Sequence, residues 1–384
     1  MNLRFHWMLP KGGEVAVDGR QTAREAARYR IESVREDSPA PRPDVEGWLH
    51  FARRAEEAGV ESVLISFSRY EPDPFLVGCA LGQETEKLKY IIAYRSGLMQ
   101  PTTFVQQLNT LSALIGGRVA VNIVAGSSAS EQRGYGDFLE HDERYERAEE
   151  FLTVCHAFWK NDGEVDFDGR YYRVEKGKLH TPFTAPGRTA PEIYVSGHSE
   201  QAQRLALTRG SCYLRLIDTP EKLAPVVSRF RGQGIEVCLR LCVVCRRTRD
   251  EALAAAHALL PGEEIERQER AILSGSDSQT LKHALATADN VGWMNRSLWA
   301  GLVPFYGSSA ITLVGSPAEL AEAFIAYKKI GVTQFIIAGW PKLEEMLIFG
   351  REVLPLVREA ERRLDGEPQE RHDAGRQQTE AAVD

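Results

Sequence analysis

Four arginines that could bind an anion lie in or just after predicted β-strands: Arg69, Arg95, Arg215 and Arg240. Ligand sites in barrels of parallel strands gather at the carboxyl ends of the strands. A buried arginine there needs an anionic partner, which is either an acidic neighbour or an anionic ligand. We therefore predict an anion-handling pocket, with Glu71 as a candidate acid or base if it is partly desolvated. Further candidates at strand ends are His6, Ser66, Trp340 and Lys342.

A second candidate site is the sequence Gly197-His198-Ser199, which opens a helix after a predicted strand. Free backbone N–H groups and a hydroxyl at a helix N-terminus suit a phosphate. An ordinary N-cap serine is the alternative, and the sequence does not decide between the two.

A third candidate group surrounds the apolar strand at residues 119–124, which glycines bound on both sides. Asn122 interrupts this strand, so its amide either bonds neighbouring groups or faces a ligand. In the helix that follows, His141 and Tyr145 are four residues apart and share one face.

The spacing Cys238-x3-Cys242-x2-Cys245 is that of an iron–sulfur motif, but its setting argues against a cluster. All three cysteines fall in one predicted strand, where alternate side chains point to opposite faces. Cys238, Arg240 and Cys242 then share one face and Cys245 points the other way. We interpret the cysteines as buried and unreactive, and we expect Arg240 and Cys242 to face the interior of the fold.

Alternating strands and helices are needed to position these residues. Eight strands, each followed by a helix, predict a (β/α)8 TIM barrel. An open doubly wound sheet is the alternative, but the glycine-rich turn it usually carries is missing. Residues 261–310 break the alternation, so we predict an inserted lid before the last unit, a single domain over residues 1–363 and a disordered tail over 364–384. The predicted strands are residues 3–9, 61–67, 88–95, 119–124, 193–196, 212–216, 237–244 and 334–338.

The composition of the 384 residues is that of a globular protein, with 43% hydrophobic and 26% charged residues. A net charge of −7 argues against a nucleic-acid partner. No apolar run reaches the roughly 18 residues of a membrane span. Six cysteines form no disulfide framework, and the first residues have no signal-peptide pattern, so we expect a cytoplasmic protein without a metal site.

Six segments together resemble the bacterial-luciferase-like flavin-dependent monooxygenases, and within that family the alkanesulfonate monooxygenases. The resemblance covers about residues 3–360 and is specific in order and spacing. The segments are Phe5-His6-Trp7-Met8-Leu9-Pro10, Asn122-Ile123-Val124-Ala125-Gly126-Ser127, His141-x-x-Arg144-Tyr145, Ser196-Gly197-His198-Ser199, Leu298-Trp299-Ala300-Gly301 and Gly339-Trp340-Pro341-x-Leu343-Glu344-Glu345.

The resemblance implies a barrel enzyme that takes reduced FMN from a separate NAD(P)H:flavin reductase. Such enzymes form a C4a-peroxyflavin with oxygen, and we expect a homodimer or homotetramer. We expect cofactor contacts from Ser66, Arg95, Asn122, His141, Tyr145, Gly197 and Ser199. The expected catalytic residues are His6, Glu71, Arg240, Cys242 and Trp340, and the expected substrate contacts are Arg69, Arg215, Tyr306 and Lys342.

Several positions depart from the alkanesulfonate monooxygenases. Their cysteine, active-site histidine and tyrosine are replaced here by Glu71, Cys242 and Trp340. A second histidine, a lid arginine and a tryptophan are replaced by Lys342, Tyr306 and Leu216. We therefore expect an anionic substrate other than a simple alkanesulfonate. The alternatives are a coenzyme F420-dependent hydride-transfer enzyme and a non-catalytic flavin-binding protein.

Overall fold

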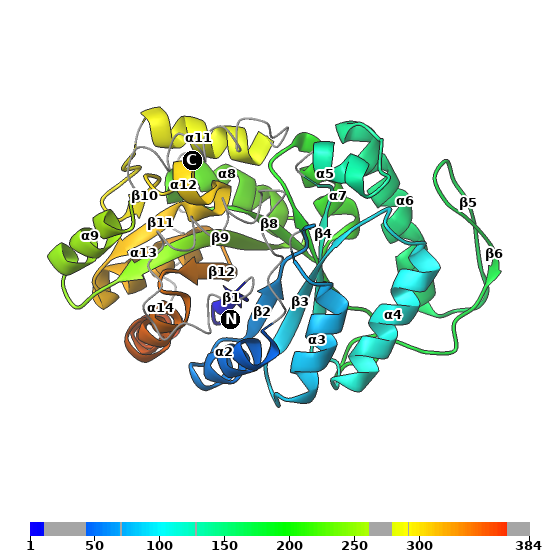
Figure 1. The fold of residues 1–384 in the computed structure, drawn as a ribbon, viewed down its shortest axis with the longest axis horizontal. Coiled ribbons are helices and arrows are strands. Elements are labelled where there is room, and N and C mark those ends of the chain that lie inside the picture. The colour runs from blue at the N-terminus through cyan, green and yellow to red at the C-terminus, as the bar shows by residue number, and fades with distance from the viewer. Residues whose placement is uncertain (11–43, 70, 127–128, 261–278, 291, 367–384) are drawn as a thin grey trace, which may run out of the picture.

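Eight parallel β-strands pair side by side until the last returns to the first, which confirms the predicted barrel (Figure 1). The computed structural model describes residues 1–10, 44–69, 71–126, 129–260, 279–290 and 292–366. Pairing of Phe5 with Phe335 closes the barrel. Its strands are β1 (Arg4–Met8), β2 (Ser62–Ile65), β3 (Lys89–Arg95), β4 (Val119–Val124), β7 (Glu192–Ser196), β8 (Cys212–Leu216), β9 (Glu236–Cys245) and β12 (Gln334–Gly339).

Helices surround the strands on the outside (Figure 1). Local capping fixes where several of them start, because the Asp44, Asp73 and Ser316 side chains each accept a first-turn N–H. No described helix is long and apolar enough to cross a membrane. The helices are α2 (Val45–Glu57), α3 (Pro74–Gln83), α4 (Pro101–Leu114), α6 (His141–Lys160), α7 (Glu200–Arg209), α8 (Pro220–Arg231), α9 (Arg249–Ala258), α13 (Pro317–Ile330), α14 (Lys342–Ile348) and α15 (Leu354–Gly366).

The inner face of the barrel is layered. An apolar middle layer contains Met8, Leu64, Ile91, Ala93, Ala120, Tyr194, Cys212, Leu214, Cys238 and Ile336. One inward position further toward the carboxyl end, five strands carry a polar residue, whereas β8 and β12 carry Leu216 and Ala338. Toward the amino end, the inward positions of most strands are polar, as at His6, Ser62 and Gln334. Because side chains alternate along a strand, the inward residues at the carboxyl ends of the strands line the mouth of the barrel.

The insertion before the last strand–helix unit contains elements that the sequence pattern did not predict. Strand β11 (Thr312–Gly315) pairs in parallel with the upper half of β9, and β10 (Leu298–Trp299) pairs with β11. Helices α11 (Gln279–Asn290) and α12 (Val303–Tyr306) belong to the same insertion. Residues 261–278 of the predicted lid lie outside the described residues.

Two further elements lie between β4 and β7. A hairpin of β5 (Val165–Asp168) and β6 (Arg173–Gly177) projects at one edge of the molecule (Figure 1). Helix α5 (Ala129–Gly134) lies between β4 and α6. At the other terminus, α15 continues to Gly366, past the predicted start of the tail at 364, and residues 367–384 are outside the described part.

Candidate active site at the barrel mouth

The polar layer at the carboxyl ends of the strands brings together many of the predicted site residues. Each follows, at a spacing of two, a residue of the apolar inner layer, so each points toward the barrel axis. These inward residues come from five strands or their ends: Ser66, Arg95, Asn122, Ser196 and Arg240.

Arg240 carries a half-buried charge in this layer. Cys238, Arg240 and Cys242 lie on one face of β9, as alternation predicted, and Cys238 belongs to the inner cluster. Within the described residues, the Arg240 side chain forms no ion pair or hydrogen bond, and its buried Nε has no partner. Burial lowers the pKa of Arg240, against the opposing effect of Cys242 and Glu71. A cation held in this way is placed to receive an anion.

Glu71 lies close to Arg240 across the mouth and also contacts Ser66. The Ser66 hydroxyl donates a hydrogen bond of 2.9 Å to Glu71 Oε1. Both residues line a small cavity of about 20 Å³, large enough for about one water molecule. Glu71 is therefore a half-buried carboxylate that acts to raise the pKa of Arg240, although no hydrogen bond or ion pair joins the two among the described residues.

Arg95 points into the same layer, but its charge is already neutralised. Its guanidinium forms a 2.8 Å ion pair with Glu131 of α5, and both side chains are nearly buried. Glu131 also accepts the backbone N–H of Arg69 at 2.8 Å. The Arg95 guanidinium lies 5.1 Å from the ring centre of Phe67. The partner of Arg95 is thus an acidic residue of the chain, the structural alternative that the sequence left open.

Asn122 and Ser196 form a pair between neighbouring strands. The Ser196 hydroxyl donates a 2.6 Å hydrogen bond to Asn122 Oδ1, and Asn122 is buried. This bond satisfies the amide carbonyl that would otherwise be costly inside an apolar strand. The pair connects the middle of β4 to the turn that follows β7.

That turn, Gly197 to Ser199, has the form of an anion cradle. Gly197 has φ +145°, and an added Cβ would lie 2.6 Å from Ala202 Cβ and 2.9 Å from the Tyr145 hydroxyl oxygen. Only glycine lets the backbone come this close to its neighbours. The Ser199 side chain caps α7, accepting the Ala202 N–H at 3.2 Å, and is hydrogen-bonded to Tyr145. First-turn N–H groups of a ten-residue helix therefore point at the turn.

Two predicted residues lie beside this turn. The His141 ring packs against Tyr145, with ring centres 5.1 Å apart, and its Nδ1 is 2.6 Å from Asp142. Arg215 on β8 has the opposite orientation to the inward Leu214 and lies close enough to His198 to lower the pKa of that ring. Among the described residues Arg215 has no hydrogen-bond or ion-pair partner, and its buried Nε is unpaired. A phosphate fits this donor set of helix N–H groups, hydroxyls and arginine.

An aromatic wall covers another side of the mouth. The rings of Tyr306 and Trp340 are 4.7 Å apart, and the Tyr306 hydroxyl donates to the Leu259 carbonyl at 2.9 Å. Both pack in one cluster with Cys242. Burial raises the pKa of Cys242 to about 12, so it is a thiol that donates to the Ser309 carbonyl at 3.3 Å. Lys342, at the start of α14, adds a positive charge near Cys242.

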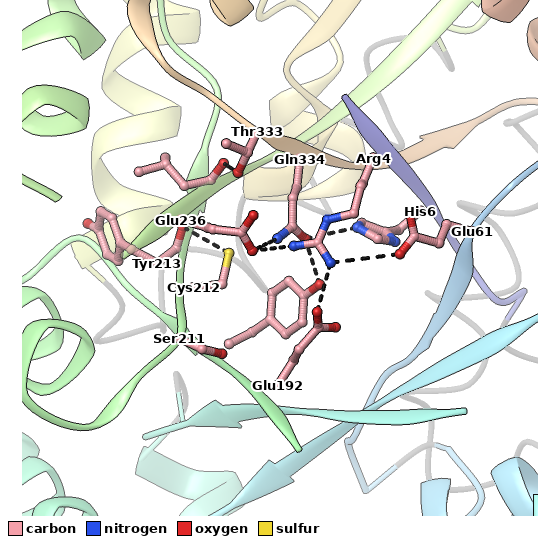
Figure 2. A network of polar contacts seen from close by, with 12 residues as sticks. Arg4, His6, Glu61, Glu192, Ser211, Cys212, Tyr213, Glu236, Thr333 and Gln334 are labelled. Atoms are coloured by element: carbon pink, nitrogen blue, oxygen red, sulfur yellow. Dashed lines mark hydrogen bonds and ion pairs between the residues drawn. The ribbon is translucent and has the colours of Figure 1, made fainter. Parts of the chain in front are cut away.

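His6 does not join these residues. It lies in the middle of β1, one inward position nearer the amino end than Met8, and its ring nitrogens are 2.9 Å from Gln334 Oε1 (Figure 2) and 2.5 Å from Ser62 Oγ. Burial lowers the pKa of His6 to about 4. In the same layer Arg4 forms ion pairs with three carboxylates, those of Glu61, Glu192 and Glu236. The amino-terminal face of such a barrel serves stability, so His6 belongs to this polar layer and not to the mouth.

Three contributors to the mouth were missed by the sequence analysis. Glu131 lies in a short helix with no apolar periodicity, and Ser309 precedes the unpredicted strand β11. His283 reaches the turn from the insertion. None of these has a local sequence signal, because each is defined by a contact with a residue far away in the chain.

Solved structures of other proteins share this fold. The structure of EDTA monooxygenase from Chelativorans sp. BNC1 matches with a TM-score of 0.73 and 20% identity over 94% of both chains. Riboflavin lyase, solved with a modified FMN and riboflavin, matches at 0.72 and 20% over 94% of this chain and 92% of its own. An F420-dependent secondary alcohol dehydrogenase matches at 0.62 and 18% over 93% and 100%. The family model described as luciferase-like monooxygenase matches residues 16–334, so this chain belongs to that family.

Proposed function

We propose that this protein is a reduced-FMN-dependent monooxygenase that inserts oxygen from O2 into an anionic small organic molecule. A separate NAD(P)H:flavin reductase would supply the reduced FMN. The observation that carries the proposal is the charge of Arg240. This half-buried cation lies at the mouth of a luciferase-like barrel, and no described residue forms an ion pair with it. An unpaired charge in such a place is costly, and a bound anion would remove the cost.

The turn after β7 supports FMN as the cofactor. Gly197, Ser199 and Tyr145 would hold its phosphate, with Arg215 adding a positive charge next to the turn. When bound, the flavin supplies the redox and oxygen chemistry, which protein side chains lack. Free FMN and FAD differ at this phosphate, which is terminal in FMN and part of a pyrophosphate in FAD. A short cradle against Tyr145 therefore favours FMN.

The residues around the mouth have distinct roles in this proposal. Arg240 orients the anionic group of the substrate, and Tyr306 and Trp340 exclude water from that side. Glu71, held by Ser66, is the candidate acid or base. Cys242 stays protonated because burial raises its pKa to about 12, so it donates a hydrogen bond and does not act as a base.

Cofactor binding tests the first half of the proposal. Anaerobic titrations with reduced FMN, reduced FAD, NADPH and reduced F420 should show the tightest binding for reduced FMN. Tight F420 binding with none of FMN would favour the hydride-transfer alternative, for which F420-dependent enzymes of the same fold provide a precedent. Binding of FMN without oxygen consumption, in the presence of a reductase and every tested substrate, would favour a non-catalytic flavin-binding protein.

Substrate charge tests the second half. A panel of sulfonates, carboxylates and phosphonates should be compared with neutral molecules of the same shape. Arg240→Lys keeps the charge but loses the planar fork, so binding of bidentate anions should weaken while neutral molecules are unaffected. Arg247→Lys is the matched control, because it makes the same change at an exposed arginine just after the same strand. Preference for the neutral molecules in the unmodified protein would contradict the proposal.

A further inference from the structure

Helix α11 of the insertion touches the proposed phosphate turn directly. The Oγ1 atom of Thr280 is 3.1 Å from His198 Nδ1. The rings of His198 and His283 stack, with centres 5.8 Å apart and planes inclined by 30°. Thr280 and His283 are three residues apart, so both lie on one face of α11 and both point at the turn. In Figure 1, α11 lies along the carboxyl-end side of the barrel near α8 and α12.

His283 also contacts the loop after β8. Its Nε2 lies 3.8 Å from Asp218 Oδ2, so a protonated His283 would form an ion pair with that buried carboxylate. Asp218 already contacts Lys222 at 3.4 Å and accepts the Thr219 N–H at 2.7 Å. The helix therefore bridges two loops, one after β7 and one after β8.

Cations and one carboxylate surround the two histidines. His198 lies near Arg215 and His283, and burial together with these two neighbours lowers its pKa to about 3. Among the described residues, the other charged or titratable groups facing the pair are Asp218, Lys222 and Tyr145. A phosphate bound beside Arg215 would place negative charge next to the two rings, where an imidazole N–H can donate a hydrogen bond to it.

We propose that α11 is a latch for the bound phosphate: Thr280 and His283 complete the anion site from the insertion side, so that phosphate binding and docking of α11 are one coupled event. The inference rests on the proposed function, because it takes the FMN phosphate as the occupant. It adds two residues to that site. Docking of α11 would then couple occupancy of the cofactor site to the barrel mouth, because Tyr306 of α12 belongs to the same insertion.

The coupling has a measurable signature in phosphate selectivity. FMN and riboflavin differ only by the phosphate, so the ratio of their affinities isolates the latch. In the unmodified protein FMN should bind more tightly than riboflavin. His283→Ala should reduce this ratio about two- to fivefold, the size expected of a partly exposed polar contact. Lys282→Ala, the adjacent residue of the same helix, is the matched control and should leave the ratio unchanged.

Hydrogen exchange of α11 gives a readout that does not depend on activity. FMN, or inorganic phosphate alone, should protect the 279–290 segment, whereas riboflavin should not. If the protein binds no flavin but phosphate protects α11 from exchange, the proposed function is wrong and the proposed role of α11 in phosphate binding is supported. Equal FMN-to-riboflavin ratios in the unmodified protein and His283→Ala, or no protection of α11 by either FMN or phosphate, would overturn the latch.

Discussion

The same substitution at the two ends of the barrel should have opposite effects on stability. Arg4 and Arg240 both point into the barrel, Arg4 from the amino end of β1 and Arg240 from the upper part of β9. Arg4 lies 2.8 Å from Glu192 and 3.7 Å from Glu61, and it also contacts Glu236 (Figure 2). Arg240 has no such partner within the described residues.

Methionine removes the charge of either arginine and keeps much of the side-chain volume. In Arg4→Met, Glu236 loses its cation and Glu192 keeps Arg188 at 3.7 Å; both carboxylates are largely shielded from solvent. Glu61 keeps Lys89 at 2.9 Å. Removing one partner of a buried ion pair costs about 3–5 kcal/mol, and the loss of the Arg4 contacts with Glu192 and Glu236 places Arg4→Met in that range.

In Arg240→Met the energy balance is different, because no described residue loses an ion-pair partner. The substitution removes a half-buried cation that has no counter-ion, and the desolvation penalty of that cation disappears. The expected effect on the free energy of unfolding is between zero and a gain of about 2 kcal/mol. The two variants should therefore differ by at least about 3 kcal/mol, with Arg240→Met the more stable.

Urea unfolding without flavin or substrate, followed by circular dichroism at pH 7, measures the difference. The midpoint should fall in Arg4→Met and stay or rise in Arg240→Met, with similar m-values in all three proteins. Arg240→Met should at the same time lose affinity for anionic substrates. A loss of stability in Arg240→Met as large as that in Arg4→Met would refute the reasoning, since it would make Arg240 a structural ion-pair partner. It would also remove the main support for an anionic substrate.

Three other outcomes follow from the structure. Gly197→Ala should destabilise the protein by about 1–3 kcal/mol and weaken FMN binding, whereas Gly163→Ala, at nearly the same φ of +144° but with open space around it, should cost less and leave titrations with FMN unchanged. The pKa of His6 is lowered from 6.5 to about 4, so the unfolded chain takes up a proton at higher pH than the folded protein does. The free energy of unfolding should therefore fall by up to about 3 kcal/mol as pH decreases from 6.5 to about 4. In His6→Asn the free energy of unfolding should depend less on pH in this range. Glu131→Gln leaves the nearly buried Arg95 without its counter-ion and should cost about 3–5 kcal/mol in urea unfolding; a cost below about 1 kcal/mol would show that Arg95 is neutralised by another group.

Local periodicity was sufficient to predict the barrel. The strands at 119–124 and 212–216 have the predicted bounds, and alternation along β9 predicted the inward face that carries Cys238 and Arg240. These features depend on residues adjacent in sequence, where the periods of strand and helix act directly. Strand β11 was missed because it is four residues long and lies in a segment of mixed polarity.

The pairing of charges could not be predicted in the same way. Arg95 and Arg240 look alike in sequence, since both are arginines near the carboxyl ends of apolar strands. Glu131, which neutralises Arg95, comes from a six-residue helix more than thirty positions away, whereas no equivalent residue approaches Arg240 in the described part of the chain. Which arginine is left for a ligand is decided by such long-range contacts, and no local pattern contains them.

Within the described part of the chain, two arginines near the mouth have no hydrogen-bond or ion-pair partner, and they lie on opposite faces of the barrel wall. Arg240 faces the axis, because it shares a face of β9 with Cys238, whereas Arg215 alternates with the inward Leu214 and faces the turn at His198. Their side chains leave the sheet on opposite faces, so we expect each to meet its own anion. The proposed enzyme therefore needs two anions, the phosphate of the flavin outside the wall and the charged group of the substrate inside it. Because these are separate sites, saturating inorganic phosphate should compete with FMN and should not compete with an anionic substrate.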